Sequence, residues 1–437
     1  MQGHCLAAIP RSASTNLDDD TLRSSPVLVA ESPLPPTRVS VIVPVRNEAE
    51  MLPETLLALA NQVNFNGDRL ESKSYEVIVF ANNCTDDSAA IARQFAQQHS
   101  QFQLHVVEQT LPPQEAHIGR VRQMLMDEAY RRLQGLGQPY GIIASTDGDS
   151  QVDRHWIAAM RYEIEQGADA VGGRTVTHRA ERAALDAATK ASYLRFVGYR
   201  YLIKQLEDYL DPDPFDKAPR HYQFFGANFA VTHEMYALAG GMPLVPTSED
   251  VAFHNAIVKV GAKVRHSPLM RVTTSARHQG RATMGLADRL SQFQALGQRR
   301  QSFLVASAAE VRARLLVRRD LRRYWGQATS DPFRAALAPQ RLAQLATRLA
   351  VPMADLHQAI EQSLTFGELF QRVEQCQQTI GIWQQQWAAV PIEMAIADLR
   401  LYLNQQRQQA SPQAGDRWPG AELRDNSVPT PNVALTV

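Results

Sequence analysis

Residues 39–45 read VSVIVPV, a run dominated by β-branched apolar residues. A run of this kind, without polar residues at every second position, is typical of a strand buried on both faces. Strands buried on both faces belong to sheets that helices cover from both sides, so this stretch predicts an α/β fold. The polar stretch RNEAE (46–50) follows directly and ends the strand.

The same alternation continues through the first 150 residues. Strands next to helices along the chain predict parallel strands joined by crossovers. In such sheets ligands bind beyond the carboxyl ends of the strands, where residues 44–48, 82–87 and 147–149 lie here. The expected elements are strands at 75–81, 102–108 and 141–146 and helices at 51–63, 86–98 and 119–133.

After residue 156 the pattern becomes α+β and then helical. We expect a long helix over 181–208, a Pro/Asp loop at 211–220, the run FFGANFAV (224–231) and a helix at 251–261. Residues 283–410, dominated by Leu, Ala and Gln, look wholly helical. The expected divisions are a flexible leader over 1–37, an α/β domain over 38–282, a helical region over 283–410 and a flexible tail over 411–437.

Composition excludes several classes of protein. Lys plus Arg and Asp plus Glu each number 45, so the formal net charge is zero, which argues against a general nucleic-acid-binding protein. Three distant cysteines, Cys5, Cys84 and Cys376, indicate neither a disulfide framework nor a zinc site. No apolar run approaches the roughly 18–20 residues of a membrane-spanning helix, and the N-terminus lacks a signal-peptide pattern. We therefore expect a cytoplasmic protein.

The turn after the first strand, PVRNEAE (44–50), contains no glycine. It therefore lacks the G-x-G-x-x-G fingerprint of dinucleotide-binding domains, and no G-x-x-x-x-G-K-[ST] loop of NTPases is present. If the domain binds a nucleotide phosphate, a hard cation held by carboxylates is the remaining common device.

The sequence TDGDS (146–150) offers such carboxylates. Asp147 and Asp149 are separated by Gly148, which lets the turn tighten. Two interpretations are open, because an acidic turn after a strand is often only a solvated turn. In the other interpretation both carboxylates point at one divalent ion.

The sequence TSED (247–250) precedes an apolar helix. Ser248 is a good N-cap, and acids in a first turn complement the helix dipole. Asp250 is alternatively a general base that takes the proton from an attacking hydroxyl.

The basic stretch SARHQGRA (275–282) also has two interpretations. It is either an exposed loop, or a site where His278 ligates a metal and Arg277 and Arg281 neutralise phosphate oxygens.

Taken in order, these motifs resemble those of the family 2 glycosyltransferases, which are metal-dependent, inverting enzymes of the GT-A fold. The resemblance covers about residues 38–281 and implies a GT-A nucleotide-diphospho-sugar transferase domain, with a mostly parallel sheet between helices, at 38–282. The segments that carry it are VSVIVPVRNEAE, VIVFANNCTDDS, IGRVRQ, IIASTDGDS, GADAVGG, FFGANFAV, GGMP and TSEDVAF.

The resemblance also implies roles for single residues. Asp147, Asp149 and His278 would hold Mg²⁺ or Mn²⁺ on the diphosphate of the donor. Asp250 would be the general base, with Glu249 beside it in the catalytic motif. Asn82 and Asn83 stand where many members have an acid, so the contact to the base would be a side-chain amide. The loop at Gly240 and Gly241 would close over the acceptor. The implied donor-binding residues are Pro44, Arg46, Glu48, Asn83, Asp87, Arg122 and Asp147.

The implied function is the transfer of one sugar from a nucleotide-diphosphate-sugar to the hydroxyl of an acceptor, with inversion. Two alternatives stay open. The first is a nucleotidyltransferase that makes nucleotide-sugars, although PVRNEAE is not the G-x-x-T-R loop of those enzymes. The second is a nucleotide-sugar-binding protein of the same fold without catalysis. The basic stretch 311–325 is either a solvated arginine face or a peripheral contact with anionic lipid.

Overall fold

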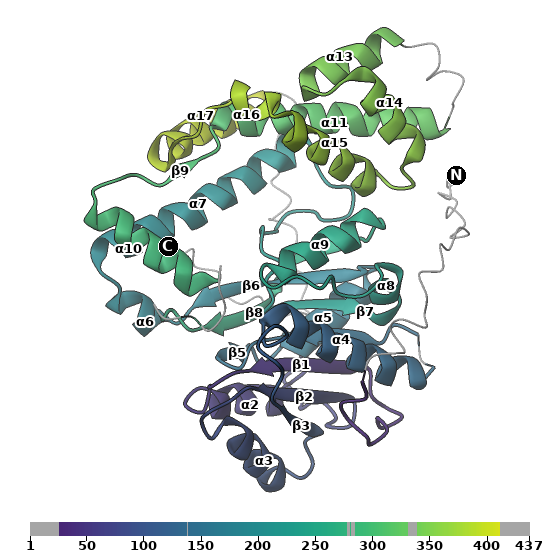
Figure 1. The fold of residues 1–437 in the computed structure, drawn as a ribbon, viewed down its shortest axis with the longest axis vertical. Coiled ribbons are helices and arrows are strands. Elements are labelled where there is room, and N and C mark those ends of the chain that lie inside the picture. Colours follow the sequence, from purple (N-terminus) through teal and green to yellow (C-terminus); the bar gives the residue numbers. More distant parts are fainter. Residues whose placement is uncertain (1–25, 138, 278–279, 281–284, 331–338, 411–437) are drawn as a thin grey trace.

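The computed structural model describes residues 26–137, 139–277, 280, 285–330 and 339–410. Within these residues an eight-stranded sheet, in the order β3-β2-β1-β4-β7-β6-β8-β5, forms the centre of the α/β domain. Figure 1 shows helices packed around this sheet. Helix α10 lies between α7 and α6, and the later helices of the C-terminal region, from α11 to α17, gather beyond α7 and α9. An α/β domain followed by a helical region is therefore confirmed.

The sheet contains β1 (Val39–Val45), β2 (Tyr75–Asn82), β3 (Leu104–Gln109), β4 (Ile142–Ser145), β5 (Ser150–Val152), β6 (Ala170–Thr177), β7 (Phe229–Thr232) and β8 (Val264–Thr274). The helices of this domain are α2 (Leu52–Ala60), α3 (Ser88–Gln98), α4 (Ile118–Gly135), α5 (Trp156–Glu165), α6 (Arg179–Ala184), α7 (Ala187–Leu210), α8 (His233–Leu238) and α9 (Glu249–Lys259). The C-terminal region contains α10 (Leu286–Gln298), α11 (Ala308–Ser330), α13 (Pro339–Leu349), α14 (Met353–Gln362), α15 (Phe366–Ile380), α16 (Ile382–Gln386) and α17 (Ile392–Ala410), with a short ladder of β9 (Leu304–Val305) and β10 (Val390–Pro391).

Strand β1 is buried along its whole length, as its sequence predicts. Val41 and Val43 pack in the cluster that includes Leu56 of α2, and Ile42 packs in the opposite cluster with Leu125 of α4. Each such side chain contributes about 1.5–3 kcal/mol of hydrophobic stabilisation. The strand pairs in parallel with β2 on one side and with β4 on the other, so the carboxyl ends of all three meet at one edge.

The second half of the sheet is less regular than the first. Strand β7 runs antiparallel to β4 and β6, and the edge strand β5 runs antiparallel to β8. The single helix expected over 181–208 is two helices, α6 and α7. The break occurs because Asp186 caps α7 by accepting hydrogen bonds from the amides of Ala188 and Thr189.

Residues just before β1 pack against the domain, although their composition predicts a flexible leader. The amide of Leu28 donates to Glu128 of α4 at 3.2 Å, and Val29 is buried in the core. Arg132 of α4 donates to the carbonyl oxygen of Glu31 at 2.5 Å. The rest of the expected leader, residues 1–25, and the expected tail, residues 411–437, lie outside the described residues.

The basic helix α11 directs several arginines into ion pairs with the α/β domain. Arg318 pairs with Glu207 at 2.6 Å and with Asp211 at 2.5 Å, and Arg322 pairs with Asp211 at 3.2 Å. These pairs fasten α11 to the C-terminal end of α7, so Arg318 and Arg322 do not form the exposed basic face that both interpretations of 311–325 assume. None of the helices in the described ranges is both long enough and apolar enough to span a membrane.

Acidic pH should destabilise the fold through a buried, neutral histidine. The Nε2 atom of His221 lies 3.0 Å from the carbonyl oxygen of Ser267, and its Nδ1 atom accepts a hydrogen bond from the amide of Gln223 at 3.0 Å. Burial, helped by the neighbouring His266, lowers the pKa of His221 to about 3. The unfolded state therefore binds the proton below pH 6.5 and the folded state does not, so stability falls with pH across that window. Between pH 7 and pH 5 we expect a loss of about 2 kcal/mol from this residue.

Urea unfolding at pH 7 and pH 5 measures this loss. His221→Asn, which cannot titrate, should show a smaller loss than the wild type over the same interval. His357→Gln, at an exposed position on α14, is the control. An equal loss in His221→Asn and in the wild type would refute the assignment to His221.

Candidate active site

The centre of the site is Arg122, a buried arginine in the first part of α4. The helix begins with His117 as its N-cap, whose side chain accepts a hydrogen bond from the amide of Arg120. Arg122 lies under the carboxyl ends of the strands with only 2% of its side chain exposed. Its guanidinium therefore needs partners inside the protein, because an unpaired buried charge is costly.

Each nitrogen of the Arg122 guanidinium has a partner from a different motif. The Nη2 atom pairs with Asp147 at 2.9 Å, and Nε pairs with Glu249 at 3.1 Å. The Nη1 atom donates to the hydroxyl of Ser145 and to the carbonyl oxygen of Gly226, the latter at 2.7 Å. Although burial opposes its charge, Asp147 and Glu249 raise the pKa of Arg122. One guanidinium thus joins the DGD, SED and FFGAN motifs.

Asp250 is oriented by two backbone amides. Its Oδ2 atom accepts a hydrogen bond from Gly226 at 3.0 Å, and its Oδ1 atom accepts one from Val251 at 2.8 Å. Each carboxylate oxygen keeps a second lone pair, so Asp250 can still accept a proton from a bound hydroxyl. Ser248 is the N-cap residue of α9, as expected, but it adopts a left-handed conformation (φ 56°) and its side chain makes no capping hydrogen bond.

Asp149 lies close to two other carboxylates, those of Asp147 and Glu48. Burial and the charges of Asp147 and Glu48 raise the pKa of Asp149 to about 6, although Arg277 opposes this rise. Arg277 pairs with Asp149 at 3.0 Å and binds both oxygens of Glu48 at 2.7 and 2.9 Å. Negative charge is thus concentrated where β4 ends.

This concentration of carboxylates fits a divalent cation held on a diphosphate. Asp147, Asp149 and Glu48 face one another with Arg277 between Glu48 and Asp149, and a cation would lower the repulsion among these carboxylates. The part of the chain that the structure describes holds no group of three or more His, Cys, Asp or Glu residues able to bind a metal by themselves. Phosphate oxygens and water would therefore complete the coordination around Asp147 and Asp149, which is the usual mode of Mg²⁺. His278, the third expected ligand, lies outside the described residues.

Hydrogen bonds join the loops after β1 and β2, and they hold the backbone of Glu48 in position. The amide of Glu48 donates to the hydroxyl of Ser88 at 2.8 Å, and the amide of Ala49 donates to Asp86 at 3.0 Å. The expected donor-binding residues in these loops differ in environment. Pro44 and Glu48 are buried, Asn83 is half-buried, and Arg46 and Asp87 are exposed.

Asn83 uses both parts of its side-chain amide within the protein. Its Nδ2 atom donates to the carbonyl oxygen of Leu111, and its Oδ1 atom accepts from the amide of Leu111, both at 3.0 Å. In contrast, Asn82 Oδ1 and Thr146 Oγ1 are buried at the ends of β2 and β4 without a hydrogen-bond partner among the described residues. Sequence reasoning missed Thr146, and no local signal marks it, because it reads as the last residue of an apolar run.

The loop with Gly240 and Gly241 packs on the N-terminal turn of α4 rather than standing free. Both glycines adopt φ 78°, and Gly241 donates to the carbonyl oxygen of Tyr236 at 3.0 Å. A Cβ atom at Gly119 would lie 1.7 Å from the carbonyl oxygen of Val245. The close approach of α4 and this loop therefore requires glycine at position 119.

Gly119→Ala should destabilise the protein by about 1–3 kcal/mol, because the loop must move to admit the methyl group. Gly135, at the end of the same helix, is the matched control, since a Cβ atom there meets no atom within 4 Å. Gly135→Ala should be neutral or stabilising by about 0.4–1 kcal/mol. Urea unfolding of both variants measures the contrast, and equal stabilities would contradict it.

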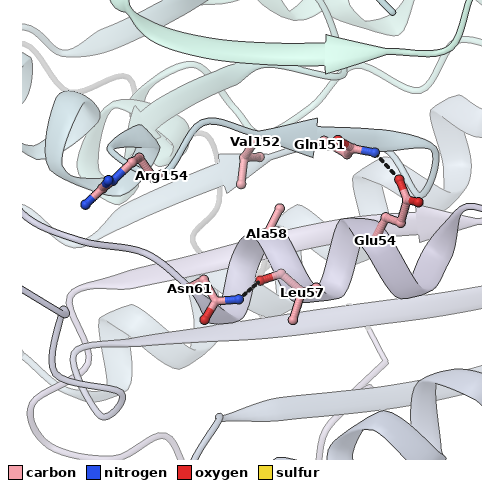
Figure 2. A pocket seen from close by; sticks show the side chains of 7 residues that line it. All are labelled: Glu54, Leu57, Ala58, Asn61, Gln151, Val152 and Arg154. Carbon is pink, nitrogen blue, oxygen red and sulfur yellow. Dashed lines mark hydrogen bonds between the residues drawn. The ribbon is translucent and has the colours of Figure 1, made fainter.

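An open surface pocket of about 430 Å³ lies between α2 and β5 (Figure 2). In this pocket Gln151 donates to Glu54, and Asn61 donates to the carbonyl oxygen of Leu57 at 2.9 Å. None of the expected donor or catalytic residues lines it. The residues that do are Glu54, Leu57, Ala58, Asn61, Gln151, Val152 and Arg154.

The sheet order and the carboxylates at its edge define an α/β protein with an acidic site at the ends of its strands. Residues 40–218 match the sequence model of glycosyl transferase family 2, so the chain carries a domain of that family. A curated relative, glycosyltransferase AglE of Haloferax volcanii, is 30% identical over 137 residues. The match covers 31% of this chain and 38% of the length of AglE.

Two solved structures show weak overall similarity. The mannosyltransferase PcManGT from Pyrobaculum calidifontis, in complex with GDP-Man and Mn²⁺, is 18% identical, with a TM-score of 0.39 and coverage of 90% of this chain and 93% of that one. Residues 1–349 of S. aureus TarS, in complex with UDP, are 12% identical, with a TM-score of 0.39 and coverage of 88% and 95%.

Proposed function

We propose that this protein is an inverting glycosyltransferase that moves one sugar from a nucleotide-diphosphate-sugar to an acceptor hydroxyl. The observation that carries the proposal is the Arg122 network, because it holds the carboxylate of Asp147 and the helix start bearing Asp250 around one edge of the sheet. A family 2 glycosyl transferase domain over residues 40–218 supports the same reaction class.

The donor would lie along the carboxyl ends of β1, β2 and β4. A divalent cation, Mg²⁺ or Mn²⁺, bound by Asp147 and Asp149 would supply the charge neutralisation that the diphosphate leaving group needs. Asn82 Oδ1 and Thr146 Oγ1 have no hydrogen-bond partner in the described part of the chain and are buried acceptors available to the nucleoside. We therefore assign the amide contact to Asn82 rather than to Asn83.

Asp250 acts as the general base in this proposal. The two amides that it accepts from fix its carboxylate at the start of α9, where it takes the proton from the acceptor hydroxyl as that hydroxyl attacks the anomeric carbon. A single displacement of this kind inverts the configuration. Glu249 is buried and pairs with Arg122, so it positions the guanidinium and does not touch the substrate.

Two alternatives predict a different outcome. A nucleotidyltransferase would release pyrophosphate from a nucleoside triphosphate and a sugar phosphate, and a binding protein would release nothing. The test incubates the full chain with Mn²⁺ and either a panel of nucleotide-sugars or nucleoside triphosphates with sugar phosphates. It measures free nucleoside diphosphate in the first case and pyrophosphate in the second. Release from one donor that increases with an added acceptor supports the proposal. Pyrophosphate release from a nucleoside triphosphate, or no product from any donor, would contradict it.

A further inference from the structure

Arg277 spans two acidic residues from distant parts of the chain. Its Nη1 and Nη2 atoms bind the Oε2 and Oε1 atoms of Glu48 at 2.9 and 2.7 Å, a bidentate pair. The same Nη2 atom lies 3.0 Å from Oδ2 of Asp149. The Glu48 side chain is 7% exposed and that of Asp149 is 14% exposed, so solvent screens these contacts only in part.

The guanidinium of Arg277 therefore contacts one oxygen of Asp149, a carboxylate that the proposed function assigns to the divalent cation. A cation on Asp149 and the guanidinium on the same side chain repel each other, because both carry positive charge at short range. Glu48 can keep Arg277 nearby when the contact with Asp149 is lost, because the bidentate pair does not involve Asp149.

We infer that the positive charge of Arg277 competes with the divalent cation for Asp149, an inference that rests on the proposed function. In the protein without nucleotide, Arg277 satisfies Asp149 and weakens binding of the free cation. When the cation arrives with a nucleoside diphosphate, the guanidinium leaves Asp149, remains on Glu48 and binds the diphosphate oxygens instead. Cation and nucleotide then strengthen each other's binding, and this coupling is reciprocal.

The coupling has a consequence for selectivity. Free Mn²⁺ or Mg²⁺ would bind this site poorly, whereas the complex of the cation with a nucleoside diphosphate would bind well, because only the complex offers Arg277 a replacement anion. Arg277 is thus a nucleotide-binding residue whose contribution is visible in cation binding without turnover.

The test measures Mn²⁺ binding to the full chain by electron paramagnetic resonance of free Mn²⁺, without nucleotide and with saturating UDP or GDP. For Arg277→Gln we expect Mn²⁺ affinity without nucleotide to rise at least tenfold, and the enhancement of Mn²⁺ affinity by the nucleotide to shrink. Arg277→Lys keeps the positive charge and should remain closer to the wild type. Arg372→Gln removes an ion-paired arginine from α15, outside the site, and should bind Mn²⁺ as the wild type does.

The outcomes separate the inference from the proposed function. Unchanged or weaker Mn²⁺ affinity in folded Arg277→Gln, with nucleotide still enhancing Mn²⁺ binding to the wild type, overturns the inference alone. If Mn²⁺ does not bind the wild type even with UDP or GDP, the cation role in the proposed function fails and this inference fails with it. The circular dichroism spectrum of each variant shows that it is folded.

Discussion

Asp250→Asn should retain donor binding and lose sugar transfer by about 10²- to 10⁴-fold in kcat, the usual contribution of a general base. The substituted amide can still accept the hydrogen bond that Gly226 donates to Asp250 at 3.0 Å, so the start of α9 should keep its place. The amide nitrogen cannot take a proton from an attacking hydroxyl. Calorimetry with Mn²⁺ and nucleotide measures donor binding, and release of nucleoside diphosphate measures turnover.

Glu234→Gln is a matched control for Asp250→Asn. Glu234 is an acid in the first turn of α8, as Asp250 is in the first turn of α9, so both substitutions remove the same favourable charge from a helix start. Glu234→Gln should turn over like the wild type. Turnover of Asp250→Asn within a few-fold of the wild type would leave Asp250 as a helix-start acid without catalytic function.

Arg122→Met should lower the free energy of unfolding by about 3–5 kcal/mol, the cost of removing one partner from a buried ion pair. Methionine fills much of the space but leaves Glu249, which is 7% exposed on its side chain, without its positive partner. The carbonyl oxygen of Gly226 and the hydroxyl of Ser145 also lose a donor. Urea unfolding measures the loss, and activity should fall with it because Asp147 is no longer held.

The double variant Arg122→Met/Glu249→Gln shows whether the stability lost in Arg122→Met comes from the unpaired charge of Glu249 or from altered packing. Removing the negative charge as well should recover part of the lost stability, because the carboxylate is then no longer buried unpaired. Activity should not return, since Asp147 still lacks its partner at 2.9 Å. A double variant as unstable as the sum of the two single variants would show that the buried charge pair is not the cause.

The first half of the fold could be predicted because each strand carries its own signal. β1 is apolar along both faces, and that pattern alone implies helices on both sides of it. The sequence does not predict strand β8, because its run VRHSPLMRVTT mixes charged and apolar residues without a clear period. This segment is a strand because it pairs with β6 and β5. The expected helix is split at Asp186 because this single residue caps a new helix there.

Sequence motifs indicate which residues belong to the candidate site, but they do not indicate which of these residues contact one another. Asp147, Asp149 and Asp250 follow from local sequences at strand and helix ends. The pairing of Arg122 with Glu249 spans 127 positions, and that of Arg277 with Glu48 spans 229, so no local pattern reveals either. Both pairs depend on the tertiary fold, because distant segments must converge before the charges can meet.

The central claim is that the carboxylates where β4 ends bind a divalent cation on a nucleoside diphosphate. The most direct measurement is calorimetry of UDP and GDP binding with and without Mn²⁺, on the wild type, Asp149→Asn and Asp153→Asn. Asp153 accepts a local hydrogen bond from the amide of His155, so its variant controls for loss of an acid nearby. We expect Mn²⁺ to strengthen binding of one nucleotide to the wild type and to Asp153→Asn, and to have no effect on Asp149→Asn. Equal Mn²⁺-dependent affinity in all three proteins would contradict the claim.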